Sequence, residues 1–389
     1  MIISLFILFI LIFVIYKFVE NKNELAFISS ENIEKDLLEE TKAIIYFSTT
    51  ADQDYDGKGL SYATFVQNDH SIETLKMKGL ELGSIAVGEN NEQIMLEDKE
   101  TVHIIDKEVT QFPIETVQYT GERTGYLEAQ GLFFSIYNTG FSPNGYQSDI
   151  RFGNEGKIQT DSIPYYIVAS GVNDDKIQIV TQDFDTNSFT LREVLIQEDE
   201  LKISDVSLLQ TETTENMQAL APVTADAQYY YLILSTLHNE TNETVGIYRI
   251  NKETAKQDYY ELVSYNDIEL TATIPYNYKN SASIYGNKLY YINGLGDVYS
   301  FDLESTEVKH EFELVDASKL KIRNNEETYF KDGKLYVLRF NENAKTPYYL
   351  ETYSLKECKR TDIFEIDGLE KLLDLEKAKS IYSYDLKVF

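Results

Sequence analysis

The chain has 389 residues, of which 65 are Asp or Glu and 35 are Lys or Arg, so its formal net charge is −30 at pH 7. Such an acidic surface repels phosphate backbones, and we expect no nucleic-acid partner. A hydrophobic content of 43% with 13% aromatic residues indicates a folded core, while a single cysteine, Cys358, rules out an intramolecular disulfide.

The chain opens with an apolar segment. Residues 2–16 are interrupted only by Ser4, and Phe18 and Val19 extend the run. At ~1.5 Å per helical residue, ~19 residues reach ~28 Å, close to the ~30 Å of a bilayer core. No small-residue cleavage site follows, which favours an uncleaved anchor over a cleaved signal peptide. We expect residues 1–19 to form a single transmembrane helix in the cell membrane.

The charges beside this segment bear on its orientation. Lys17 and Lys22 follow the run and no basic residue precedes it, so the positive-inside rule alone would keep the large domain in the cytoplasm. Long domains translocate largely regardless of such a bias, and an N-terminal apolar segment is the usual export device. We therefore expect the large domain to be extracytoplasmic, with the cytoplasmic side as the alternative.

Residues 20–42 read as a polar connector with one short helix. Ser30 can cap this helix, and Ile33, Leu37 and Leu38 lie on one face of it. This pattern predicts a stalk between the anchor and a folded domain at residues 43–389.

From residue 43 the chain is a succession of short strands and turns. The clearest unit is residues 284–308, in which glycine-containing turns at 286–287 and 294–296 separate three short strands. Gly and Asn supply the positive φ angles that tight hairpins require. The same order of turn and strand recurs at residues 330–353, so a repeated antiparallel unit is predicted.

Two further patterns indicate how the units are arranged. Doubled aromatics place rings on both faces of their strands, which suits sheets that are covered on both sides. The pairs are Phe133-Phe134, Tyr165-Tyr166, Tyr229-Tyr230, Tyr290-Tyr291 and Tyr348-Tyr349. The candidate inner hairpin strands recur at intervals that straddle the ~40–50 residues of a propeller blade. They lie near Tyr62, Ile94, Phe133, Ile177, Tyr231, Leu289 and Tyr336.

Residues 287–305 and 333–355, with weaker echoes at 176–198 and 229–253, resemble the β-propeller superfamily in the manner of its non-enzymatic bacterial members. The resemblance covers residues 43–389 and implies an all-β fold with seven blades. Two tandem β-sandwich domains are the alternative fold. The chain has no tryptophan, so the Trp-Asp signature is absent and no functional residues follow from the resemblance.

One acidic loop has the composition of a metal site. Asp52, Asp54 and Asp56 alternate before Gly57, as at the start of a calcium loop, and Ca²⁺ prefers several such oxygens. However, Ala63 stands at the twelfth position, where a helical calcium hand carries a bidentate Glu. We predict Ca²⁺ as the one candidate cofactor, and an exposed acidic turn is the alternative.

No nucleophile elbow, phosphate-binding loop or zinc spacing occurs in the chain, so no catalytic residue is assigned. We expect a membrane-anchored β-propeller that binds a protein or a cell-surface polymer as an assembly module. The alternative is a carboxylate-dependent hydrolase or lyase that acts on cell-surface polymer, with Ca²⁺ assistance. Buried acids with raised pKa values at the channel mouth would favour the enzyme, and a tyrosine-rich rim would favour the binding module.

Overall fold

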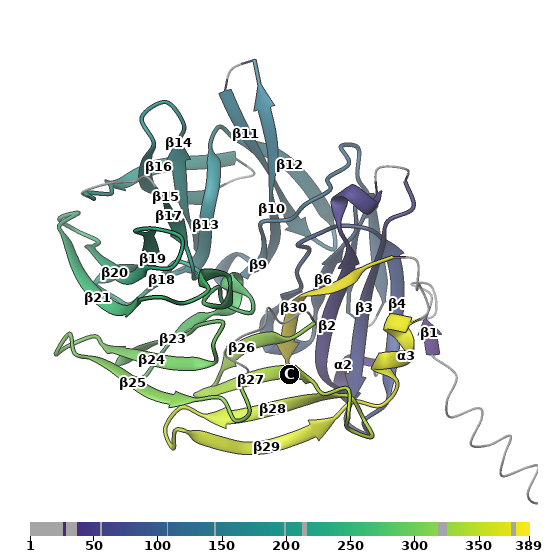
Figure 1. Cartoon of the computed structure of the whole chain (residues 1–389). Helices are drawn as coiled ribbons and strands as arrows, with labels where there is room; N and C mark the ends of the chain where they lie inside the picture. Colours follow the sequence, from purple (N-terminus) through teal and green to yellow (C-terminus); the bar gives the residue numbers. More distant parts are fainter. Residues whose placement is uncertain are drawn as a thin grey trace, which may run out of the picture.

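The computed structural model describes residues 26–28, 37–54, 57–106, 108–143, 145–197, 200–211, 216–317, 325–374 and 379–389. These residues form seven β-sheets arranged in a ring (Figure 1). The sheets are numbered here as blades 1–7 in chain order. The prediction of an all-β, seven-bladed propeller is confirmed, and the alternative of two tandem sandwiches is wrong.

Blade 1 joins the two ends of the described chain. Strand β30 (Ile381–Val388) pairs antiparallel with β2 (Thr41–Thr49), so the ring is closed by main-chain hydrogen bonds. Figure 1 shows the two strands side by side, one purple and one yellow. The rest of blade 1 is β3 (Leu60–Gln67), β4 (Ile72–Lys78) and β1 (Ala26–Ile28), and β1 adds to β4 in parallel.

The other blades run from the innermost strand outward in chain order, and two short strands share the innermost position of blade 5. Blade 2 consists of β5 (Ala86–Val87), β6 (Ile94–Glu97), β7 (Thr101–Ile105) and β8 (Val109–Pro113). Blade 3 consists of β9 (Arg123–Leu127), β10 (Leu132–Ser142), β11 (Gly145–Asn154) and β12 (Lys157–Ile163). Blade 4 consists of β13 (Tyr166–Asn173), β14 (Lys176–Asp183), β15 (Ser188–Gln197) and β16 (Glu200–Leu208).

The later blades follow the same plan. Blade 5 consists of β17 (Met217–Ala219), β18 (Thr224–Ala225), β19 (Tyr229–Leu237), β20 (Glu243–Asn251) and β21 (Gln257–Tyr265). Blade 6 consists of β22 (Ala282–Tyr285), β23 (Lys288–Ile292), β24 (Asp297–Asp302) and β25 (Val308–Glu313). Blade 7 consists of β26 (Glu327–Lys331), β27 (Lys334–Phe340), β28 (Tyr348–Ser354) and β29 (Lys359–Glu365), and the short helix α3 (Leu369–Asp374) then leads to β30.

The repeat predicted from the sequence corresponds to blades 6 and 7. The runs 288–292 and 334–338 lie in β23 and β27, the second strands of neighbouring blades. The seven candidate inner strands fall one in each blade. In six blades the candidate is the second strand; in blade 1 it is β3, because β30 takes the innermost place.

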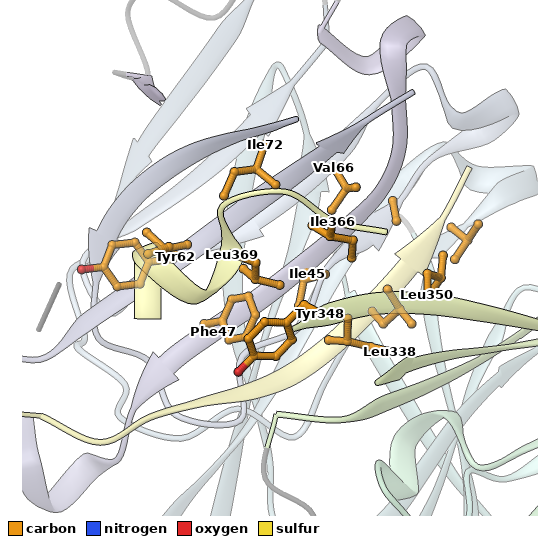
Figure 2. Packing of buried hydrophobic residues seen from close by; sticks show 14 of the residues in the cluster. Ile45, Phe47, Tyr62, Val66, Ile72, Leu338, Tyr348, Leu350, Ile366 and Leu369 are labelled. Atoms are coloured by element: carbon orange, nitrogen blue, oxygen red, sulfur yellow. The ribbon is translucent and has the colours of Figure 1, made fainter. Parts of the chain in front are cut away.

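The cores lie between the blades, one between each neighbouring pair. Three of the five doubled aromatic pairs place their rings in two different cores; for example, Phe133 packs between blades 2 and 3, while Phe134 packs between blades 3 and 4. Each such side chain contributes about 1.5–3 kcal/mol by leaving water. Figure 2 shows the cluster between blades 7 and 1, in which Leu338 and Tyr348 of blade 7 pack in one core with Phe47 of blade 1.

The predicted anchor, residues 1–19, lies outside the described residues, as does most of the connector at 20–42. Two parts of that connector are described, β1 and the short helix α2 (Leu37–Glu40), and β2 begins at Thr41 rather than at residue 43. In the described part of the chain, no helix is both long and apolar enough to cross a membrane.

Candidate functional site

One short segment between blades 5 and 6 fills the centre of the ring. Residues 277–281, around the helical turn η6 (Tyr278–Asn280), hydrogen-bond to residues of several other blades. Asn277 Nδ2 donates to Glu327 Oε2 of blade 7 at 2.8 Å and to the Tyr384 carbonyl of blade 1 at 2.9 Å. Ser281 Oγ donates to the Leu220 carbonyl of blade 5 at 2.7 Å. The ring is therefore plugged at this level by a polar segment, which we call the axial segment.

Ionisable side chains surround the axial segment. Lys279 is 5% exposed, and its ammonium donates to the carbonyls of Leu82 at 2.5 Å and Gly121 at 3.3 Å. Burial lowers the pKa of Lys279 to about 8. Burial also raises the pKa of Glu327 to about 8, so this carboxyl is largely protonated at neutral pH.

Two clefts open beside the axial segment and share Leu82 and Tyr278 in their walls. The larger has a volume of about 370 Å³ and is lined by Glu122, Tyr166 and Gln182 among others. The smaller has a volume of about 250 Å³. Both are lined by residues that precede or begin innermost strands, which places them at one end of the ring.

A cluster of exposed aromatic rings adjoins the larger cleft. Phe141 is 74% exposed and Phe184 is 50% exposed, and their ring centroids lie 5.4 Å apart. Tyr146 contacts both rings, at 5.1 Å and 5.8 Å. Tyr166 contacts Tyr146 at 4.9 Å and Phe184 at 5.2 Å, and it also lines the cleft. These four residues are called the aromatic rim.

The hairpin that carries the rim differs from what its composition suggests. Residues 138–144 are rich in Asn, Gly, Ser and Pro, a composition typical of a loop. In the structure β10 continues to Ser142 and β11 begins at Gly145, with a register irregularity between Asn138 and Gly140. Gly140 has a φ angle of +112°, a backbone conformation in which a residue with a side chain would be strained. The strands therefore extend further than this composition suggests (Figure 1), and Phe141 pairs with Tyr146 close to the turn of the hairpin.

The surroundings of the rim are acidic. Between residues 132 and 191 there are 7 acidic residues and 3 basic ones. Two of the basic residues, Arg151 and Lys176, are ion-paired with glutamates. Asp183 and Asp185 flank Phe184, and hydrogen bonds to Asp183 from the backbone N–H groups of Thr186 and Asp185 lower its pKa. The rim therefore combines exposed rings with exposed negative charge.

The predicted calcium loop lies elsewhere, between β2 and β3. Asp54 is 3% exposed and forms an ion pair with Lys99 of blade 2. Its carboxylate also accepts a hydrogen bond from Gly59 N and fills the space that a side chain at residue 59 would need. Asp52 and Asp54 belong to the same helical turn, Ala51–Asp54, and Asp56 lies outside the described residues.

Within the described residues no three His, Cys, Asp or Glu side chains are placed to hold one metal ion together. Asp56 lies outside the described residues, so calcium binding at Asp52, Asp54 and Asp56 stays a prediction. The Lys99 ammonium forms an ion pair with Asp54 and would therefore compete with Ca²⁺ for this carboxylate.

Sequence reasoning did not single out the axial segment or the rim. One signal could have indicated the former, because 16 residues, 266–281, connect β21 to β22, and connections that long are usually functional. Phe141 carried no comparable signal, because it lies in a segment with the composition of a turn.

The comparisons with known proteins agree on the architecture. The family model described as YycP, beta-propeller domain, matches residues 36–389. A relative from Bacillus subtilis (strain 168), "Uncharacterized protein YycP", is 31% identical over 358 residues, which cover 91% of this chain and 89% of that protein.

Among solved structures, the similarities are weak. BamB from Moraxella catarrhalis is 12% identical, with a TM-score of 0.40, over 72% of this chain and 76% of that one. The computationally designed Ika8 protein is 10% identical, with a TM-score of 0.44, over 78% and 83%. A puromycin-hydrolyzing peptidase of Mycobacterium tuberculosis is 10% identical, with a TM-score of 0.48, over 86% and 55%. Similarities this low indicate nothing about activity, but the family match extends through all seven blades, and the chain belongs to the YycP β-propeller family.

Proposed function

We propose that the chain is a membrane-anchored, extracytoplasmic binding module, and that its aromatic rim takes up a positively charged, extended segment of a partner protein. The observation that carries this proposal is the four-ring cluster beside the larger cleft, in which both phenylalanines are exposed and both tyrosines are half-buried. Contiguous exposed apolar surface rimmed by polar residues is typical of interaction sites on soluble domains.

The chemistry of the rim selects the class of partner. Aromatic faces attract Lys and Arg side chains, by ~0.5–1 kcal/mol at exposed sites and by ~2 kcal/mol when desolvated. Asp183 and Asp185 add negative charge on either side of Phe184. The net charge of −30 accelerates the approach of a basic partner and slows that of an acidic one.

Site-specific photocrosslinking tests the proposal in the native membrane. A benzophenone side chain at position 141 should yield adducts, and mass spectrometry should place the crosslinks in Lys- or Arg-rich segments of the partner. The matched control is position 340, because Phe340 of blade 7 is also an exposed phenylalanine, at 42%. Equal labelling from both positions, or crosslinks to acidic segments, would contradict the proposal.

A separate experiment tests on which side of the membrane the propeller lies. The apolar run at 2–16 and the absence of a cleavage site support a retained anchor with the propeller outside the cell. Protease added to intact cells should then digest residues 43–389. Digestion only after lysis would show that the positive charges at Lys17 and Lys22 had kept the domain in the cytoplasm.

A second function, that of a hydrolase or lyase acting on cell-surface polymer, is favoured by one observation. Glu327 lines the smaller cleft, is 2% exposed, and has a pKa raised to about 8 by burial, as a general acid requires. If this carboxyl is catalytic, the purified chain should shorten cell-wall polysaccharide and Glu327→Gln should not. An intact polymer after prolonged incubation with the wild-type chain would exclude this function.

A further inference from the structure

The smaller cleft has a lining unlike that of the aromatic rim. Four half-buried tyrosines contribute to its wall, together with polar groups of the axial segment and of blades 7 and 1. The tyrosines are Tyr276, Tyr278, Tyr382 and Tyr384. A tyrosine ring offers an apolar face and a polar tip, so such a wall suits a ligand that has both kinds of surface.

The charged groups of the cleft are already compensated. The Glu326 carboxylate accepts hydrogen bonds from Arg339 Nε at 3.3 Å and from Phe340 N at 3.2 Å. The Lys279 ammonium donates to two carbonyl oxygens, and the nearby carboxylates of Glu122 and Asp385 offset its charge. Glu327 is bonded by the Asn277 amide. An ionic ligand would therefore meet no unbalanced opposite charge, and burying its own charge would cost free energy.

We propose that the smaller cleft is a binding site for a neutral sugar unit of a polysaccharide or glycan. Apolar faces of a sugar ring would pack on the tyrosines, and its hydroxyls would exchange hydrogen bonds with amide, carboxyl and phenol groups. Tyr278 and Leu82 also line the larger cleft, so the two clefts are neighbours. This site goes beyond the proposed protein-binding rim and does not depend on it. It shares its cleft with Glu327 of the second proposed function, and binding of a sugar that is not cleaved supports the site even where that enzymatic function fails.

Titration calorimetry on the full chain, held in nanodiscs without sugar detergents, tests the proposal. The probes are cellotriose and chitotriose, which are neutral, with tri-galacturonic acid and trilysine as charged counterparts. We expect a neutral trisaccharide to bind with a Kd of about 1 mM or tighter, while the charged probes bind at least tenfold more weakly.

Tyr382→Ala should weaken the binding of that trisaccharide about tenfold or more. Tyr285→Ala is the matched control, because Tyr285 is a 45% exposed tyrosine at the turn between β22 and β23, and this variant should bind as the wild type does. Saturation-transfer NMR on the wild-type chain needs no substitution. It should show the sugar C–H protons receiving magnetisation from tyrosine rings.

Three results would overturn the sugar site: no neutral trisaccharide binding at about 10 mM, preference for a charged probe, or equal weakening by both tyrosine variants. The Phe141→Ser/Phe184→Ser double variant should leave sugar binding unchanged. Failure of the sugar site is thereby distinguishable from failure of the rim proposal.

Discussion

Aromatic rings serve two different purposes in the blade walls and at the rim. In the walls of blades 3, 4 and 5, an arginine on the third strand lies over a tyrosine ring and pairs with an acid. Arg151 lies 4.7 Å from the Tyr137 ring centroid and pairs with Glu97. At the rim, the rings of Phe141, Tyr146, Tyr166 and Phe184 contact one another, and both phenylalanines are exposed.

The same arrangement is repeated in the next two blades. Arg192 lies 3.8 Å from Tyr165 and pairs with Asp205, and Arg249 lies 4.5 Å from Tyr229 and pairs with Asp258. In the blade walls, arginines of the same blade therefore cover the tyrosine rings, whereas the rings of the rim lie beside the carboxylates of Asp183 and Asp185. Substitutions in the interior should therefore reduce stability, and substitutions at the rim should reduce binding.

The largest loss of stability is expected from Arg151→Ala. Both Arg151 and Glu97 are buried, with side chains 4% and 1% exposed, so the substitution leaves an unpaired buried carboxylate. The free energy of unfolding should fall by about 3–5 kcal/mol in denaturant titrations. Arg192→Ala is the control. This substitution should cost about 1 kcal/mol, because Asp205, the partner that it leaves unpaired, is 70% exposed to water. Equal losses would contradict the distinction between buried and exposed pairs.

Glu327, which accepts a hydrogen bond from Asn277 of the axial segment, makes stability depend on pH. Glu327 has a pKa of about 8 in the folded chain against 4.5 ordinarily, so the folded state holds an extra proton between these values. The contribution of Glu327 to stability should therefore be greatest below about pH 4.5 and fall as pH rises to about 8, by at most about 1.4 kcal/mol per unit.

Glu327→Gln should flatten this part of the stability curve, whereas Glu304→Gln, at an exposed turn after β24, should leave it unchanged. The measurement is the unfolding free energy from denaturant titrations between pH 5 and 8. The same slope in the wild type and in Glu327→Gln would rule out Glu327 as the titrating group.

The sequence predicts the inner strands far better than the outer ones. Residues 288–292 and 334–338 are apolar because they are covered by neighbouring blades, and they read plainly as strands. The fourth strands β16, β25 and β29 are mostly half-buried or exposed, so their polar sequences carry little periodic signal. The candidate site escaped prediction for a further reason: Glu327, Lys279 and Phe141 acquire their roles from contacts between blades that are distant in sequence.

Calcium binding at the Asp52–Asp54–Asp56 loop is expected to depend on Lys99. If Ca²⁺ binds only the folded chain, a concentration 100 times its Kd adds ~2.7 kcal/mol and raises the Tm by a few degrees. Lys99→Met should increase this response, because it removes the ammonium that pairs with Asp54. Asp54→Asn with Asp56→Asn should abolish it. Identical calorimetric transitions in Ca²⁺ and in chelator, for both wild type and Lys99→Met, would rule out the site.

The smallest effect on stability is expected at the rim. Phe141→Ser should change the unfolding free energy by no more than about 0.5 kcal/mol, because this side chain is 74% exposed. Phe184→Ser should cost about 1 kcal/mol, because half of the Phe184 side chain is covered by other rings of the rim. Phe134→Ala, in the same strand as Phe141 but fully buried, should cost about 3–5 kcal/mol. A large loss from Phe141→Ser would show that the rim is structural.

The most direct test of the rim proposal is the affinity for a cationic probe. Octa-arginine is titrated into the full chain in nanodiscs of zwitterionic lipid, and the wild type is compared with Phe141→Ser/Phe184→Ser. Since each lost ring removes ~0.5–2 kcal/mol of cation–π attraction, we predict that the double variant binds about tenfold more weakly or worse, while Phe340→Ser binds like the wild type. Equal affinity in all three proteins would show that general charge attraction suffices, and it would contradict the role of the aromatic rim.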